Sequence, residues 1–215
     1  MRRLFGVFAG FLAVLVGTPT SAFAQGKTYV LFDGVVLTGK ARFFGPNTTP
    51  EARNILEHGG PLEAKSRLFP GIELRFNQSG RLILGVGVQR WNLEKFEHSS
   101  YIYPDGGEYR YDEIRKADGE VVTGTLYVNL LTRGPARPFV GVGSGIAVLK
   151  GSYTIANIVD RGVSHPDYTQ TADLLKDVVK GVAGLNIYPA KHLLFSIAGG
   201  YINGPALNVG VGVTF

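Results

Sequence analysis

The stretch LNVGVGVTF at positions 207–215 decides the fold class, because its side chains alternate strictly between two kinds. Its odd-numbered positions are all apolar, and its even-numbered positions hold asparagine, glycine and threonine. Such a period of two is typical of a β-strand, whose successive side chains point to opposite faces. Valine opposite glycine recurs in RLILGVGVQ (81–89) and in FVGVGSGIAVL (139–149), so the pattern is a repeating unit of the chain.

Reading every alternating run as a strand predicts an all-β fold, an eight-stranded antiparallel up-and-down transmembrane β-barrel. The predicted strands are Lys27 to Thr38, Arg67 to Phe76, Arg81 to Leu93, Glu120 to Leu131, Pro138 to Lys150, Leu174 to Tyr188, His192 to Ile202 and Pro205 to Phe215. The sixth strand has an alternative, since 171–178 also carries the apolar spacing of an amphipathic helix. A short helix that runs into a strand near Val179 would satisfy both patterns.

The lengths of the connections favour a barrel that crosses a membrane. The segments 77–80, 132–137 and 189–191 are short turns rich in glycine, proline or asparagine, whereas 39–66, 96–119 and 151–173 are predicted to be long polar loops. Short turns on one rim and long loops on the other are typical of outer-membrane barrels. The connection at Asn203 and Gly204 is an exception, because it is short on the rim of the long loops.

The alternation also predicts which face of each strand meets lipid. Charged and amide side chains gather on the face opposite the apolar one, which is the reverse of a soluble barrel. We therefore expect a polar network in a lumen filled by side chains, in which the acidic side chains form ion pairs with the basic ones. Its members are Asp33, Glu73, Arg75, Gln89, Tyr127, Asn129, Lys180 and Asn186. The alternative is a soluble lipocalin-like barrel, whose interior should be larger and richer in aromatic residues.

The amino terminus has the order of a secretory signal peptide. Arg2 and Arg3 precede an apolar run from Leu4 to Val16, and the segment closes on Ala22-Phe23-Ala24. The run is shorter than the ~20 residues that a transmembrane helix needs. We expect cleavage after Ala24, which makes 1–24 the signal peptide and 25–215 the barrel domain, exported through the inner membrane to the outer membrane.

The amino-acid composition limits the kinds of catalytic, metal and nucleic-acid sites that the chain can contain. The chain has no cysteine, which excludes thiol catalysis and iron–sulfur clusters, and its histidines lie too far apart in sequence to build a local metal site. The formal charge of +5 includes Arg2 and Arg3 of the leader, and the remaining bases are scattered, so nucleic acid is not an expected partner. We expect no cofactor and no metal.

With the leader, the Gly-Val strands and the terminal aromatic residue in view, the chain resembles the small outer-membrane β-barrel proteins of Gram-negative bacteria, of the OmpA/OmpW-like kind. The likeness covers essentially the whole mature chain. It implies that the last strand, with Val211, Val213 and Phe215, is the signal read by the barrel-assembly machinery. It also implies contact with outer-membrane lipid and lipopolysaccharide. Such folds carry many functions, so the resemblance points to a location more firmly than to an activity.

Three functions are open at this level. The first is a structural or surface-interaction barrel, not an open general porin, that reaches an extracellular ligand through its long loops. The second is an OmpW-like conduit or binder for small hydrophobic molecules. The third is a lipid-modifying enzyme built on His98 and Ser99, but neighbouring residues of a strand point to opposite faces, so we expect no enzyme.

The tyrosines of 96–119 suggest two further hypotheses about this segment. Tyr101, Tyr103, Tyr109 and Tyr111 alternate with charged residues. They fit an extended hairpin with cross-strand aromatic contacts, or else an adhesive or receptor surface.

Overall fold

The computed structural model describes residues 27–37, 40–43, 49–57, 62, 68–77 and 81–214. The predicted leader and Phe215 lie outside these residues. The strands and the helix of the described part are β1 (Lys27–Leu37), α3 (Pro50–Glu57), β2 (Leu68–Asn77), β3 (Leu82–Ile102), β4 (Glu108–Asn129), β5 (Ala136–Asp160), β6 (Val163–Ser164), β7 (Tyr168–Ala190), β8 (Leu193–Ile202) and β9 (Pro205–Thr214).

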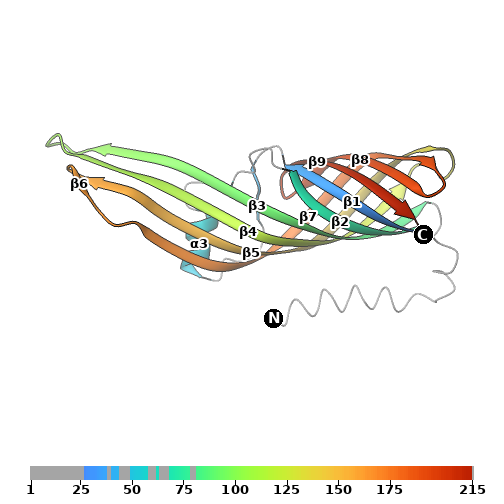
Figure 1. Ribbon diagram of the computed structural model, residues 1–215, viewed down its shortest axis with the longest axis horizontal. Coiled ribbons are helices and arrows are strands. Elements are labelled where there is room, and N and C mark those ends of the chain that lie inside the picture. The colour runs from blue at the N-terminus through green and yellow to red at the C-terminus, as the bar shows by residue number, and fades with distance from the viewer. Residues whose placement is uncertain are drawn as a thin grey trace.

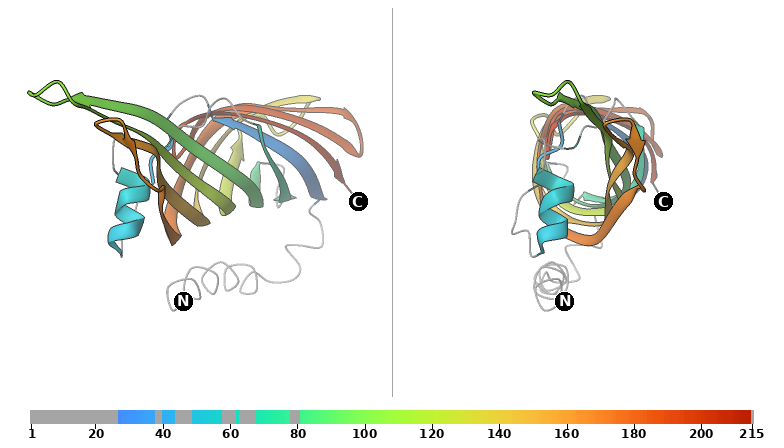
Figure 2. Two further views of the ribbon diagram at one scale, coloured as in Figure 1. Left: turned by 60° about the vertical axis from the view of Figure 1, so that its left-hand side comes forward. Right: turned by 90° about the vertical axis from the view of Figure 1, so that its left-hand side faces the viewer.

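Eight of these strands close into a ring, as the sequence predicts. The sheet runs in the order β4-β3-β2-β1-β9-β8-β7-β5-β6, and a further pairing of β4 with β5 joins its two sides. All pairs are antiparallel, and β1 pairs with β9, for example Phe32 with Val211. The two-residue β6 stands outside the ring and pairs only with the end of β5. The end-on view of Figure 2 shows the closed ring.

The wall of the ring has two heights. Strands β1, β2, β8 and β9 contain 11, 10, 10 and 10 residues, about what a membrane crossing needs. Strands β3, β4, β5 and β7 contain 21, 22, 25 and 23 residues and run on past the short wall as one sheet (Figure 1). We call this continuation, formed by 90–102, 108–119, 149–160 and 168–179, the extended sheet.

The extended sheet corrects the prediction of long polar loops at 96–119 and 151–173. Most of these residues are strand, and the β3–β4 ladder continues from Leu82 opposite Val128 to Ile102 opposite Glu108. Only short segments remain as turns, such as 103–107 at the tip. The segment 171–178, which the sequence left open, is strand within β7. Alternation did not reveal the extension because both of its faces carry polar residues.

Helix α3 lies in the connection between β1 and β2, part of a segment that was predicted to be a polar loop. Its start is fixed locally, because the hydroxyl of Thr49 accepts a hydrogen bond of 3.1 Å from the Ala52 amide and Pro50 occupies the first helical turn. Ile55 packs over Gly151 of β5, where a Cβ atom would come within 2.9 Å of the Ile55 side chain. The helix therefore covers the inner face of β5 and β7 at the mouth of the ring (Figure 2).

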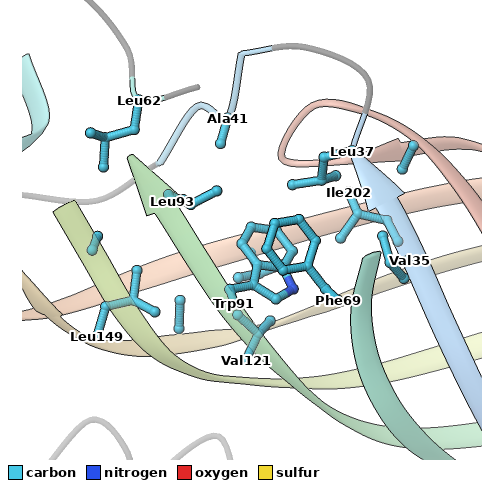
Figure 3. Close-up of a cluster of buried hydrophobic side chains, with 14 of the residues drawn as sticks. Val35, Leu37, Ala41, Leu62, Phe69, Trp91, Leu93, Val121, Leu149 and Ile202 are labelled. Carbon is cyan, nitrogen blue, oxygen red and sulfur yellow. The ribbon is translucent and has the colours of Figure 1, made fainter. Parts of the chain in front are cut away.

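The inside of the ring is filled by side chains. One apolar cluster at the mouth surrounds Trp91, whose indole packs on Phe69 with ring centroids 5.7 Å apart (Figure 3). A second cluster near the other rim consists of Tyr29, Leu31 and Leu194. An eight-stranded ring has an interior that side chains just fill.

Close strand packing makes one glycine of β5 sensitive to substitution. A Cβ atom on Gly145 would lie 1.9 Å from the carbonyl oxygen of Val122, whereas one on Gly199 of β8 would meet nothing within 4 Å. We expect Gly145→Ala to lower the free energy of unfolding by about 1–3 kcal/mol through overpacking. The matched variant Gly199→Ala should stay within about 0.5 kcal/mol of the parent. Urea unfolding of the barrel refolded in detergent micelles measures both, and equal stability of the two variants would contradict this packing.

Candidate functional site

The residues that the sequence assigns to a polar network all lie inside the ring. Asp33, Glu73, Arg75, Gln89, Tyr127, Asn129, Lys180 and Asn186 are each at most 7% exposed. They come from β1, β2, β3, β4 and β7 and point inward because they share the parity of the buried positions of their strands. The network is therefore brought together from strands that are far apart in the sequence.

Glu73 is the centre of the network. One of its carboxylate oxygens accepts a hydrogen bond of 2.8 Å from Nε of Arg75. The other accepts a hydrogen bond of 2.6 Å from the hydroxyl of Tyr127 and lies 3.6 Å from Nζ of Lys180. Lys180 in turn donates to the Tyr127 hydroxyl at 3.0 Å. A buried carboxylate without such partners would cost several kcal/mol, so these contacts make its burial tolerable.

Arg75 connects Glu73 to the far side of the lumen. Its Nη1 donates to Oδ1 of Asn186 at 3.1 Å and to the hydroxyl of Ser196 at 3.2 Å. Its guanidinium carbon lies 4.4 Å from the centre of the Tyr127 ring, which is the geometry of a cation–π contact. Asn186 also donates to Oδ1 of Asn129 at 3.4 Å. The guanidinium group thus holds several strands of the ring together across its interior.

Asp33 is the centre of a second part of the network, in which side-chain amides donate hydrogen bonds to its carboxylate. Its Oδ2 accepts hydrogen bonds of 3.1 Å from Gln89 and 3.3 Å from Asn208. The side-chain oxygen of Gln89 accepts a hydrogen bond of 3.4 Å from the indole of Trp91, which joins this branch to the apolar cluster at the mouth. The polar network and the apolar cluster of the lumen are therefore in direct contact.

Glycines on neighbouring strands provide the room for these large side chains. A Cβ atom on Gly85 would lie 2.6 Å from Oε1 of Glu73, and one on Gly141 would lie 2.6 Å from the Tyr127 ring. The inward side of the valine-glycine repeat is therefore the space that Glu73 and Tyr127 occupy.

Two groups of interior polar residues were absent from the predicted site. Ser196 and Asn208 belong to the network, and their inward parity on β8 and β9 was a usable signal. Glu113, Arg115 and Lys176 are buried at the inner face of the extended sheet. Nε of Arg115 lies 3.2 Å from Oε1 of Glu113. Glu113 and Arg115 lie in 96–119, which the sequence predicts to be a loop, whereas Lys176 shares the inward parity of Lys180 on the predicted strand from Leu174 to Tyr188, and that parity was a usable signal.

The outer surface of the ring is apolar on every strand. Exposed large apolar side chains include Phe32, Ile72, Val88, Leu126, Val142, Val179, Ile197 and Val209, one from each ring strand. Exposed charged residues flank them on β4 and on the turn that follows, with Glu120 at one end and Arg133 at the other. Soluble monomers rarely expose a contiguous apolar patch larger than about 600 Å², and an apolar belt around a whole barrel exceeds that size.

The predicted assembly residues lie on this apolar belt. Val211 and Val213 are 43% and 38% exposed on β9, which closes the ring between β8 and β1. Phe215 is outside the described residues.

His98 and Ser99 point to opposite faces of the extended sheet. Nδ1 of His98 lies 2.7 Å from Oδ1 of Asp112 on the convex face, and because a carboxylate only accepts, Nδ1 carries the proton. Asn157 donates to the second oxygen of Asp112 at 2.7 Å. The hydrogen bonds from His98 and then Asn157 hold the pKa of Asp112 below its ordinary value. His98 is thus held by the Asp112 carboxylate, whose second oxygen is bonded by the Asn157 amide, and Ser99 is across the sheet from it.

The tyrosines of the β3–β4 hairpin lie on an extended hairpin, as expected, but their close ring contacts differ from the expected cross-strand ones. Tyr101 is directly opposite Tyr109 in the ladder. The close ring contacts run along each strand, with centroids 5.3 Å apart for Tyr101 and Tyr103 and 5.5 Å apart for Tyr109 and Tyr111. Arg161 of the neighbouring tip lies 4.9 Å above the Tyr103 ring and forms a 2.8 Å ion pair with Asp105. The two tips of the extended sheet therefore support each other.

Within the described residues, no group of three or more histidine or acidic residues has the arrangement of a metal site. The described helix is not long and apolar enough to span a membrane.

Comparison with known proteins gives similar structures but no family. No family model and no curated protein matches the chain. Ail, the attachment invasion locus protein of Yersinia pestis, solved with the heparin analogue sucrose octasulfate, is 10% identical with a TM-score of 0.39, over 89% of this chain and 99% of that one. Neisserial surface protein A is 14% identical with a TM-score of 0.41, over 87% and 95%. The N-terminal β-barrel domain of Pseudomonas aeruginosa OprF is 17% identical with a TM-score of 0.39, over 89% and 100%. These values are too low to transfer a function.

The network makes the barrel sensitive to the loss of Arg75. Replacing Arg75 by alanine leaves Glu73 buried without its closest cation, and we expect the free energy of unfolding to fall by about 3–5 kcal/mol. Arg90 is the control, because its pair with Asp118 is exposed, and Arg90→Ala should cost less than about 1 kcal/mol. Urea titration of both variants in micelles tests this, and similar costs for the two arginines would refute a stabilising role for the network.

Proposed function

We propose that this chain is an outer-membrane β-barrel protein that anchors a rigid sheet outside the cell and acts through that sheet in a structural or surface-interaction role. The observation that carries the proposal is the distribution of polarity in the ring. Its outer surface is apolar and its interior is charged, which is the reverse of a soluble protein. In water, both the exposure of the apolar outer surface and the burial of the charged groups would raise the free energy. In a bilayer the outer surface meets hydrocarbon, and the closed ring satisfies the backbone hydrogen bonds internally.

The distribution of long and short segments supports an orientation. The adjacent ends of β2 and β3 at Asn77 and Leu82 and the turns at 130–135 and 191–192 lie on one rim, and the extended sheet leaves the other. In outer-membrane barrels the short turns are periplasmic and the long segments are extracellular. At a rise of about 3.4 Å per residue, the dozen or so residues of each strand above the short wall extend about 40 Å along the strand direction.

The filled interior supports a barrel that is closed to general diffusion. Trp91, Arg115, Tyr127 and Phe139 are among the largest fully buried side chains, and all four point into the ring or onto the inner face of the extended sheet. Glu73 and Arg75 lie in the same interior as a bonded pair. We therefore place the interaction surface on the extended sheet and assign the lumen a structural role.

The orientation is testable because the chain contains no cysteine, so that any introduced thiol is unique. Pro104 is exposed at the tip of the β3–β4 hairpin, and Arg133 is exposed in a turn of the opposite rim. In intact cells a membrane-impermeant maleimide should label Pro104→Cys at once and Arg133→Cys only after lysis. The parent protein should fractionate with the outer membrane. Recovery in the soluble periplasm, or equal labelling of both variants in intact cells, would rule out the proposal.

We propose further that Val211, Val213 and Phe215 form a signal for assembly. A single aromatic ring at a membrane interface contributes only about 1.5–3 kcal/mol of burial, so the closed barrel should tolerate its loss. Deleting Phe215 should cut the amount of inserted barrel in cells while leaving refolding into micelles nearly unchanged, as read from heat-modifiable migration on gels. The control is Val163→Ala at the exposed tip, which should affect neither assay. Equal losses in both assays would make Phe215 a structural residue only.

A further inference from the structure

The strand tyrosines of the extended sheet all lie on its inner face. The segments that stand side by side there are 95–101 of β3, 109–115 of β4, 153–155 of β5 and 168–172 of β7. Their inward positions share the parity of Leu93, Leu149 and Leu174, which are buried lower in the same strands. The tyrosines with this parity are Tyr101, Tyr109, Tyr111, Tyr153 and Tyr168. The outward positions of these segments carry no tyrosine, so we call the inward side chains of the four segments the tyrosine face.

The tyrosine face is buried at its base and exposed toward the tips of the sheet. Tyr153 is only 6% exposed, and helix α3 lies near it, in contact with β4, β5 and β7 (Figure 2). Tyr101 and Tyr168 are 56% and 49% exposed, and Tyr109 and Tyr111 are half-buried. The rings of a hydrophobic core would be covered. These rings therefore remain accessible to a ligand.

The charged groups of the tyrosine face balance one another. Lys95 forms an ion pair with Glu97, and Arg115 lies 3.2 Å from Glu113 and 3.9 Å from Glu97. The structure describes all four segments, and none of their other inward residues is acidic or basic. Burial and then the charge of Glu113 raise the pKa of the Tyr153 hydroxyl, so this group also stays neutral. A face without net charge offers no net attraction to a polyanion or a polycation.

Gln170 is a fixed polar group within the tyrosine face. Its Nε2 donates to the hydroxyl of Tyr168, and its Oε1 accepts a hydrogen bond of 3.2 Å from Nδ2 of Asn54 on α3. The amide is thus oriented from both ends. Its nitrogen carries a second hydrogen and its oxygen a second lone pair, so both atoms can form one more hydrogen bond each. The face therefore combines aromatic surface with an oriented donor and acceptor.

These properties match the chemistry of an uncharged sugar. The C–H groups of a pyranose ring form an apolar surface that packs on an aromatic ring, and its hydroxyls need donors and acceptors. Tyrosines lose little conformational entropy when they form such contacts. Tyr111 and Tyr168 stand on strands that are two positions apart in the sheet, about 10 Å, so a chain of sugars spans them better than a single ring does.

We propose that the tyrosine face binds a neutral oligosaccharide. Its sugar rings pack on Tyr111 and Tyr168, and Gln170 forms hydrogen bonds with its hydroxyls. This inference rests on the proposed function, which puts the extended sheet outside the cell, and it names the chemistry of the ligand that the sheet meets there.

The first experiment identifies the class of ligand. The full barrel is reconstituted into fluorescent liposomes, which carry many copies and therefore reveal weak binding. The liposomes are applied to an array of neutral, sialylated and sulfated oligosaccharides that also carries a polyproline peptide, a second kind of ligand for aromatic surfaces. We expect retention on neutral oligosaccharides, unchanged from low to high ionic strength, because salt screens only charges. Retention on charged oligosaccharides only, on the peptide only, or on nothing would overturn the proposal.

The second experiment locates the ligand by titration calorimetry of the barrel in micelles with the best retained oligosaccharide. Tyr111→Ala and Tyr168→Ala should each weaken binding at least tenfold, as expected for an aromatic anchor. Tyr111→Phe keeps the ring surface and should lose only about threefold. The matched control is Phe96→Ala, which removes a ring that is 53% exposed at the same height on the outer face and should bind within about twofold of the parent.

Heat-modifiable migration verifies that all four variants are folded. Unchanged binding by Tyr168→Ala and Tyr111→Ala, or an equal loss in Phe96→Ala, would overturn the assignment to the tyrosine face.

A third experiment distinguishes two sources of the sugar, another cell and the lipopolysaccharide of the producing cell. Beads coated with the retained oligosaccharide should bind intact cells directly in the first case, and only after removal of the O-polysaccharide in the second. Failure to bind in both would overturn the proposal. The labelling of Pro104→Cys is independent of these assays. Correct labelling without sugar binding would therefore reject the sugar site alone, and sugar binding with failed labelling would reject the location.

Discussion

Pairing of β1 with β9 is the constraint on which the rest of this structure depends. It joins the first and last strands of the ring, and its register places Phe32 beside Val211 on the outside and Asp33 beside Gly210 on the inside. A slip of one residue would exchange these faces on a strand. The charged network inside and the apolar belt outside therefore both depend on the register with which β1 and β9 close the ring.

Alternation predicted the ring because it is strict wherever one face meets apolar surroundings. Glu73, Arg75 and Lys180 could be assigned to the interior from parity alone, although their mutual contacts depend on register between strands and could not be derived from the sequence. For the extension of β3 and β4 the sequence predicts a loop, because polar residues occupy both faces there. Only the tyrosines of that segment indicated a hairpin.

Helix α3 begins at a local sequence signal that apolar periodicity does not reveal. Thr49 followed by Pro50 and Glu51 is a typical helix start, with a capping hydroxyl, a proline in the first turn and an acid near the positive end of the helix dipole. The helix is only one element in a long connection, but its position over Gly151 ties that connection to β5 and β7. Short helices of this kind are found from caps rather than from apolar spacing.

The continuity of the wall also gives the molecule a mechanical character. The ladder between β3 and β4 runs without interruption from the turn rim of the ring to the distant tip, where Ile102 is opposite Glu108. A pull on that tip along the strand direction loads many hydrogen bonds of the ladder together in shear, and the load passes directly into the ring. A tether with a flexible loop would instead stretch first. Any contact made near the tip is thus coupled stiffly to the ring, and in the proposed orientation to the cell surface.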